Sequence, residues 1–176
     1  NTFVAVGENG AIATSPEGAR WTVRDSGTHQ FLKKVAFGNN IFVAVGGNGI
    51  IVTSSNGAAW TAQAASTRGH LEGIAYGNNT FVAVGEALLT SPDGIAWTIR
   101  GPTTNHHFFG VAYGSGTFAV VGNNGVIFTS PDGSVWTRRE STTHSSLLAI
   151  AHRDGSFYTS GEEGVLLQSD SLPSPR

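Results

Sequence analysis

The hydrophobic residues of this chain occur in short runs separated by turns rich in glycine and asparagine, and the runs return at a fixed spacing. Phe-Val-Ala-Val-Gly stands at 3–7, 42–46 and 81–85, then as Phe-Ala-Val-Val-Gly at 118–122 and in a degenerate form at 157–161. The four tryptophans keep the same period of about 39 residues, at Trp21, Trp60, Trp97 and Trp136. Two independent markers with one period indicate a repeat protein.

Each unit contains four short segments with strand character. Val-Ala-Phe at 35–37 recurs as related triplets at 74–76, 111–113 and 150–152, and a Gly-Asn-Asn type of turn follows it. The Phe-Val-Ala-Val strand comes next, then an Asn-Gly turn that favours a hairpin, then a third strand such as 12–14. A Ser-Pro-Asp-Gly type of turn leads to a fourth strand that opens with Trp-Thr. No segment has the 3.6-residue period of an amphipathic helix.

Four antiparallel strands in a unit of this length match one blade of a β-propeller. One four-stranded sheet leaves both faces exposed, whereas sheets stacked around an axis cover one another. We therefore expect an all-β protein, a propeller of five blades with four antiparallel strands each, in which the terminal blades are incomplete. It would be one domain over residues 1–176, with units at about 1–38, 39–77, 78–114 and 115–153 and a partial unit at 154–176.

The turn before each tryptophan carries the most characteristic residues of the repeat. They are a serine, an acid or amide, a glycine and the tryptophan itself, with the members Ser15, Glu17 and Trp21; Ser54, Asn56 and Trp60; Ser91, Asp93 and Trp97; and Ser130, Asp132 and Trp136. This pattern resembles the Asp-box, or BNR, repeat of sialidase-like and photosystem-assembly-factor-like propellers, although one residue is missing between the acid and the glycine.

The resemblance implies that the box is a structural turn between the third and fourth strands, remote from the ligand face. Calcium or sugar binding by the row of acids and indoles is the alternative. The resemblance also implies that the Val-Ala-aromatic strand lines the axis. The chain then begins at the second strand of one blade and ends after the third strand of another, so one inner and one outer strand are missing. We expect flanking residues, strand exchange or an oligomer to supply them. A six- or seven-bladed parent that was cut short is the alternative.

Composition narrows the functional classes. Charged residues make up 12%, the net charge is −2 and the basic residues are scattered, which argues against a nucleic-acid partner. No apolar run approaches the roughly 20 residues that cross a bilayer, and the absence of Cys removes disulfide and thiolate chemistry.

Since the chain has no Met, we expect that a leader was removed or that the chain was cut from a longer one. A surface poor in Lys is common in secreted bacterial proteins, and we expect an extracellular or cell-surface location.

Candidate binding residues occur in two sets of loops that the family's strand order places on the ligand face. Turns between second and third strands carry glutamates, and longer links between blades carry five of the six histidines. The candidates are His29, His70, Asn105, His106, His107, His144, Glu8 and Glu162, with Phe108 and Phe109 nearby. The histidines stand at different distances from the following strand, so we expect no metal site and no cofactor. His152 replaces an inner-strand aromatic and is expected in the core or channel.

These features predict a non-catalytic recognition or scaffold propeller that binds a glycan or a protein on its loop face. The alternative is a polysaccharide-active enzyme, a glycoside hydrolase or lyase, that uses Glu8, Glu86 or Glu162. Sialidase chemistry in the resembled family needs a cluster of arginines, and here the arginines are scattered. Propellers host many functions, so the fold alone does not choose.

Overall fold

The computed structural model describes residues 2–101 and 106–170, and the strands in this part of the chain form five antiparallel sheets in chain order. The first and last sheets have three strands and the others have four. The first sheet contains β1 (Phe3–Val6), β2 (Ile12–Ser15) and β3 (Thr22–Arg24); the second contains β4 (Leu32–Gly38), β5 (Ile41–Gly46), β6 (Ile51–Ser54) and β7 (Thr61–Gln63); the third contains β8 (Leu71–Gly77), β9 (Thr80–Gly85), β10 (Leu88–Ser91) and β11 (Thr98–Ile99); the fourth contains β12 (Phe108–Gly114), β13 (Thr117–Gly122), β14 (Ile127–Ser130) and β15 (Thr137–Arg139); and the last contains β16 (Leu147–Arg153), β17 (Ser156–Gly161) and β18 (Leu166–Gln168).

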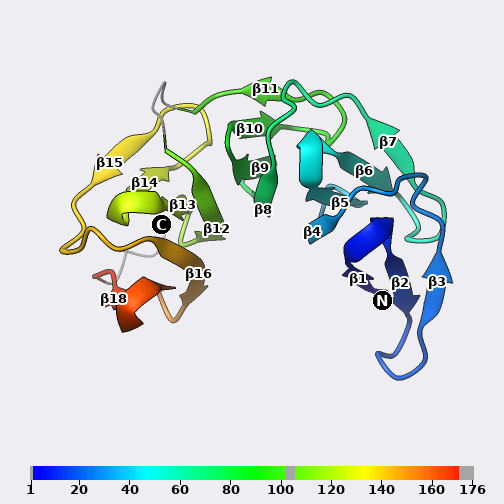
Figure 1. The fold of residues 1–176 in the computed structure, drawn as a ribbon, viewed down its shortest axis with the longest axis horizontal. Helices are drawn as coiled ribbons and strands as arrows, with labels where there is room; N and C mark the ends of the chain where they lie inside the picture. The colour runs from blue at the N-terminus through cyan, green and yellow to red at the C-terminus, as the bar shows by residue number, and fades with distance from the viewer. Residues whose placement is uncertain (1, 102–105, 171–176) are drawn as a thin grey trace.

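The sheets stand around a common axis as the blades of an incomplete propeller (Figure 1). The first strands of the four later sheets line the inside of the arc, where β8 packs against β4 and β12, and β12 packs against β16. The strands that follow the tryptophans lie on the outside (Figure 1). Among the described residues, the first sheet contains no inner strand and the last contains no outer strand. The predicted all-β, five-bladed fold with incomplete terminal blades is therefore confirmed.

Four turns between second and third strands, three with Asn-Gly and the last with Glu-Gly, fold as single 3-10 turns. These are η1 (Glu8–Gly10), η2 (Gly47–Gly49), η3 (Asn123–Gly125) and η4 (Glu162–Gly164). The middle residue of each is left-handed, with φ of 54° at Asn9, 55° at Asn48 and 57° at Glu163. Asparagine tolerates this conformation because its short side chain bonds to nearby backbone groups, which explains its recurrence at these turns.

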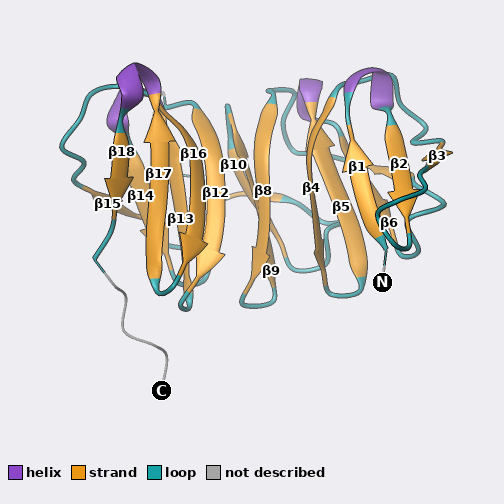
Figure 2. Cartoon of the chain, turned by 90° about the horizontal axis from the view of Figure 1, so that it is seen from below, coloured by secondary structure: helices purple, strands orange, loops and turns teal. Residues whose placement is uncertain are grey.

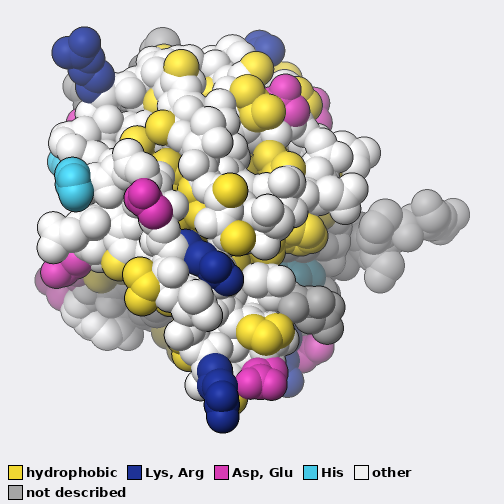
Figure 3. All heavy atoms as spheres, turned by 90° about the vertical axis from the view of Figure 1, so that its right-hand side faces the viewer, with side chains coloured by type: hydrophobic (Ala, Val, Ile, Leu, Met, Phe, Trp, Pro, Cys, Tyr) yellow, Lys and Arg dark blue, Asp and Glu magenta, His cyan; other side chains and the backbone are white. Residues whose placement is uncertain are grey.

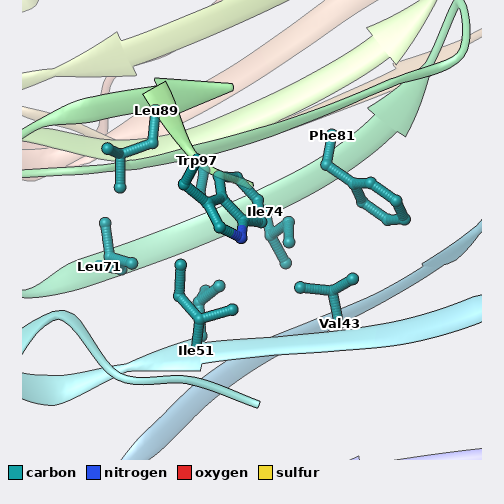
Figure 4. Packing of buried hydrophobic residues seen from close by; sticks show 9 residues of the cluster. Val43, Ile51, Leu71, Ile74, Phe81, Leu89 and Trp97 are labelled. Atoms are coloured by element: carbon teal, nitrogen blue, oxygen red, sulfur yellow. The ribbon is translucent and has the colours of Figure 1, made fainter. Parts of the chain in front are cut away.

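The hydrophobic core lies between successive sheets, where Trp60, Trp97 and Trp136 each contribute to a separate cluster, whereas Trp21 is exposed. Between the second and third sheets, Trp97 packs among Val43, Ile51, Phe81 and Leu89 (Figure 4). Its side chain is only 6% exposed. An indole fits here because neighbouring blades present two apolar faces and the large ring fills the space between their strands.

The turn before each tryptophan is held by its own side chains. Ser91 Oγ accepts a hydrogen bond from the N–H of Gly94 at 2.8 Å, and Asp93 Oδ1 accepts from two further N–H groups of the same turn at 2.9 Å each. The indole N–H of Trp97 donates to the carbonyl of Gly94 at 2.9 Å. The turns with Asn56 and Asp132 repeat these bonds. These contacts close the turn without any outside partner.

Glu17 occupies the same place in the first turn but makes a different set of contacts. Its backbone N–H donates to Ser15 Oγ at 3.4 Å, whereas within residues 2–101 and 106–170 its carboxylate accepts no bond from the turn. Glutamate is one methylene longer than aspartate, so its carboxylate extends past the N–H groups that Asp93 reaches. The turn with Glu17 therefore keeps the bonds of its serine and its indole but lacks those that a short acid or amide accepts.

The acid in this turn gives the fold a dependence on pH. The N–H groups of Ala96 and then Ile95 lower the pKa of Asp93, while burial opposes them. Because the folded pKa lies below the unfolded value of about 3.9, the stabilisation is present above that pH and is lost as pH falls through the folded pKa. In Asp93→Asn the amide oxygen accepts the same bonds, as at Asn56, and does not titrate. The urea midpoint of this variant should fall less than that of the parent between about pH 5 and pH 2.

Glu17→Gln is the matched control for this measurement, since the Glu17 carboxylate accepts no bond from its own turn within the described part of the chain. Its acid-induced loss of stability should equal that of the parent. If the urea midpoints of the parent and of Asp93→Asn fall equally with pH, the hydrogen bonds to the Asp93 carboxylate do not contribute to the pH dependence of stability.

Candidate functional site

The turns and the links between blades meet at one edge of the sheets. All four 3-10 turns lie along this edge (Figure 2). The link before each inner strand is tied to them through the backbone: the N–H of Gly47 donates to the carbonyl of Phe31 at 2.8 Å, and the N–H of Asn123 donates to that of His107 at 3.0 Å. We call this edge the link face. The structure brings both predicted loop sets together there.

Each of the four inner strands contains a β-bulge at its first residues, next to the link face. The pairing between first and second strands shifts between Leu32 and Lys34, and the same shift occurs in the three later sheets. The residues that this leaves unpaired are Lys33, Glu72, Phe109 and Leu148. A bulge turns a side chain away from the regular alternation of a strand. The four bulged residues therefore occupy equivalent positions on the inner strands, close to the link face.

Electrostatic and aromatic contacts join this row across three sheets. The carboxylate of Glu72 forms an ion pair with the ammonium of Lys33 and lies 3.7 Å from Nε2 of His107. The His107 ring lies 4.8 Å from the ring of Phe109 at an interplanar angle of 30°. Nε2 of His107 is buried and has no hydrogen-bond partner within the described ranges. The row is thus charged at the second and third sheets and apolar at the fourth and fifth.

A shallow pocket of about 180 Å³ opens on the inner wall beside the apolar end of the row. Phe109, Leu148 and Ile150 line it, and Lys34 reaches its edge. Leu148 is 45% exposed, which is high for a leucine within a strand. We refer to Lys33, Lys34, Glu72, Phe109 and Leu148 as the inner-wall surface. It combines a pocket with mixed polar and apolar lining, an exposed ammonium and an ion pair.

The predicted histidines do not form one cluster. His70 accepts from the N–H of Asn48 at 3.3 Å through Nδ1, and its own N–H donates to Glu86 Oε1 at 3.1 Å. His106 Nδ1 lies 3.3 Å from Asn123 Oδ1. Each of these histidines contacts the turn beside it. Of the predicted histidines in the described ranges, His107 is the one that contacts the bulged row, through Glu72 and Phe109.

The remaining candidates lie apart from that row. His29 and His144 are exposed on separate links, and Asn105 lies outside the described residues. The inner-strand residue His152 is half-buried, with Nε2 3.1 Å from Ser115 Oγ. Its ring contacts Phe157 edge-on at 4.9 Å, as an aromatic residue would at this position.

The predicted carboxylates are exposed on turns of three different, non-adjacent sheets. Glu8 lies on η1, Glu86 lies between β9 and β10, and Glu162 lies on η4. Across residues 2–101 and 106–170, no three side chains of His, Cys, Asp or Glu are placed to hold a metal ion. The same part of the chain contains no helix long and apolar enough to span a membrane. Paired acid chemistry needs two carboxylates across one cleft, and these three are distributed over the arc.

Charge on the outer side is equally dispersed. Lys and Arg side chains appear singly on the face shown in Figure 3. Two arginines of the outer strands bond within their own sheets: Nε of Arg24 donates to Thr14 Oγ1 at 2.9 Å, and Nε of Arg139 donates to Thr129 Oγ1 at 2.8 Å. Such contacts hold these two side chains against their own strands.

Sequence reasoning noted Phe109 only as a nearby aromatic and missed Lys33, Glu72 and Leu148. A signal for the bulge exists in the sequence, because the apolar residues Leu32 and Val35 stand three residues apart, and the same break recurs at Leu71 and Ile74. A regular strand places residues on one face at even separations. The repeated odd separation therefore marks the extra residue.

Antiparallel blades around an axis, with an exposed inner-wall surface, define this protein as a β-propeller with a candidate binding face. A family model described as the DUF6242 beta propeller domain matches residues 25–148, and the chain belongs to this family. No curated protein matches the chain.

Solved structures share the fold at low sequence identity. YCF48 from Cyanidioschyzon merolae is 17% identical, with 97% of this chain and 64% of that chain covered and a TM-score of 0.68. A structure described as YCF48 bound to D1 peptide is 20% identical, with 95% and 59% covered and a TM-score of 0.72. The WD40 beta propeller domain of Doa1 is 12% identical, with 99% and 62% covered and a TM-score of 0.75. The chain thus spans less than two thirds of each of these proteins, and the likeness shows the fold alone.

Proposed function

We propose that this chain is a non-catalytic, protein-binding propeller that holds an extended polypeptide segment on its inner-wall surface. The observation that carries the proposal is the row of four β-bulges, which places Lys33, Glu72, Phe109 and Leu148 at equivalent positions of consecutive blades. A bulge repeated in each inner strand re-aims one side chain per blade toward the same region. A partner that crosses several blades meets one of these side chains at each.

The chemistry of the surface indicates what such a segment carries. An apolar side chain fits the pocket of about 180 Å³ between Phe109 and Leu148. Lys33 is already paired with Glu72, so its charge is neutralised locally. Lys34 is exposed at the edge of the same pocket and offers an ammonium group to an acidic residue. The expected partner is therefore an extended peptide with an apolar anchor and a neighbouring carboxylate.

Two further observations support a binding role. The structure of YCF48 with D1 peptide shows that a propeller of this fold accommodates a peptide in that protein. In the present chain the three carboxylates considered for catalysis lie on separate turns, and Glu86 accepts a bond from the backbone of His70. On the inner wall, Leu148 is exposed and Phe109 is half-buried, so both can contribute apolar contacts to a partner.

The test is selection of displayed random peptides against the chain, followed by affinity measurements with the selected peptides. Phe109→Ser and Leu148→Ser should each weaken binding by about tenfold or more, equivalent to about 1.4 kcal/mol. Val135→Ser is the matched control, because Val135 is 70% exposed on the turn between β14 and β15 and does not line the inner-wall pocket. Its affinity should equal that of the parent.

Binding that survives both inner-wall substitutions would place the peptide elsewhere and contradict the proposal. A glycan array run in parallel addresses the other predicted partner. If no peptide is selected, but a glycan binds the parent and fails to bind Phe109→Ser, the ligand of this surface is a carbohydrate and the proposal of a polypeptide partner is wrong.

A further inference from the structure

A series of charged and aromatic side chains connects His107 to the inner-wall surface. Nε2 of His107 lies 3.7 Å from Oε1 of Glu72, and the other carboxylate oxygen, Oε2, is paired with the ammonium of Lys33. The His107 ring also lies 4.8 Å from the ring of Phe109, which lines the inner-wall pocket. The imidazole therefore contacts both the charged and the apolar part of this surface.

The three charged or titratable residues of this group come from three blades. Lys33 lies on β4, Glu72 lies on β8, and His107 directly precedes β12. Because Lys33 and His107 face different oxygens, the carboxylate of Glu72 can hold both at once. The Glu72 side chain is only 16% exposed, so solvent screens its charge incompletely.

Other residues whose charge matters between about pH 5 and pH 8 stand on the elements packed around this link. They are His106, Glu86, Lys34, His152 and Arg153. The first two bond to the turn or the link beside them, and the lysine lies at the edge of the pocket. The last two end β16, far from the link face. Across the described ranges, Glu72 is the one acidic residue within ion-pair distance of His107.

A proton on His107 changes the charge of the inner-wall surface. Histidine is the side chain that ordinarily gains or loses its charge between about pH 5 and pH 8. When His107 is neutral, Lys33, Lys34 and Glu72 together leave one excess positive charge. Protonation adds a second positive charge, which the Glu72 carboxylate and the face of the Phe109 ring both attract. The surface thus becomes more attractive to an anionic partner as the pH falls.

We propose that His107 makes the inner-wall surface pH-sensitive, so that an acidic peptide segment binds more tightly when this imidazole is protonated. The class of partner comes from the proposed function, on which this inference rests. By linkage, the acidic segment and the proton favour each other's binding by the same factor. Carboxylates of a flexible peptide titrate near about pH 4, so they stay ionised in the range where histidine changes its charge.

A double-mutant cycle on the chain alone tests the contact between His107 and Glu72. Urea unfolding is measured for the parent, His107→Gln, Glu72→Gln and the double variant at about pH 5.5 and about pH 8. We expect the effects of the two substitutions to be non-additive at the lower pH, where an imidazolium attracts the carboxylate, and close to additive at the higher pH. Equal coupling at both pH values would overturn the inference.

Affinity measurements with a selected peptide that carries one carboxylate test the effect on binding. The parent should bind this peptide about threefold or more tightly at about pH 5.5 than at about pH 8, as expected for one added ion pair near a surface. The same peptide with Gln in place of its acid should bind equally at both pH values. His107→Gln should remove the difference that the acidic peptide shows.

His144→Gln is the matched control, because His144 is exposed on another link and does not line the inner-wall pocket. This variant should keep the pH dependence of the parent. A pH dependence that survives in His107→Gln, or disappears in His144→Gln, would assign the effect to another group and overturn the inference.

The outcomes distinguish this inference from the proposed function. Peptide binding that is lost in Phe109→Ser but is equal at both pH values in the parent overturns the role of His107 and leaves the proposed function intact. If no peptide binds the inner wall at either pH, the proposed function is wrong, and the inference about its regulation is wrong with it.

Discussion

Replacing Trp97 with Ala should lower the free energy of unfolding by about 3–5 kcal/mol, the range measured for large aromatic residues removed from cores. The side chain is 6% exposed and packs against both the second and the third sheet. Its removal takes away apolar contacts from two blades at once, and the surrounding strands cannot close the space because their pairing is fixed. Urea unfolding followed by far-UV circular dichroism measures the loss without relying on indole fluorescence.

Trp21→Ala is the matched control for this experiment. Trp21 closes an equivalent turn, and its indole N–H donates to Gly18 at 3.0 Å, yet its side chain is 47% exposed and belongs to none of the hydrophobic clusters of the described residues. The same chemical change should therefore cost less than about 1 kcal/mol. Equal losses for Trp21→Ala and Trp97→Ala would mean that the turn, and not the packing between blades, accounts for the stabilisation.

Gly46→Ala should destabilise the fold by about 3 kcal/mol or more, at the upper end of the range for overpacking. The backbone of Gly46 is extended, so any residue can adopt it. The obstacle is steric: a Cβ on Gly46 would overlap the carbonyl oxygen of Phe31, which accepts a bond from Gly47. Because that oxygen belongs to the backbone that leads into β4, relief requires the link and the inner strand to move.

Gly7→Ala is the control with the same backbone conformation and an open environment. Among the described residues, a Cβ on Gly7 would meet only the side chain of Ala11, at 3.9 Å. Its effect should stay within about 0.5 kcal/mol, as for surface substitutions. A small loss of stability in both variants would show that the link before β4 moves easily to make room for the Cβ. A large loss in both would show that alanine is unfavourable in this extended conformation whatever surrounds it.

The comparison of these two glycines explains how much of the fold was predictable. Gly7 and Gly46 look alike in the sequence, because both end a Phe-Val-Ala-Val run, and that run correctly predicted a strand in every unit. Alternation and turn chemistry are local properties, so the strands and their hairpin order could be predicted. Whether a carbonyl from another segment approaches the glycine depends on the neighbouring link, which no local pattern specifies.

The candidate site was less predictable for the same reason. The histidines were chosen because they recur in the links, and the structure leaves His29 and His144 exposed while His107 contacts the bulged row. Lys33 and Glu72 stand 39 residues apart and form an ion pair only because equivalent strands of adjacent blades lie side by side. This ion pair could be predicted only by knowing how adjacent blades are arranged around the axis, in addition to the repeat.

The sequence by itself determined the repeat, the strand order within each sheet and the left-handed turns, because hydrophobic alternation and asparagine chemistry act within a few residues. Tertiary structure decided which indoles are buried and which bulged side chains meet at the inner wall. Those outcomes depend on the face that the next sheet presents. Trp21 and Trp97 are equivalent in sequence and differ in burial because Trp97 packs against side chains of two sheets, whereas Trp21 belongs to none of the hydrophobic clusters of the described residues.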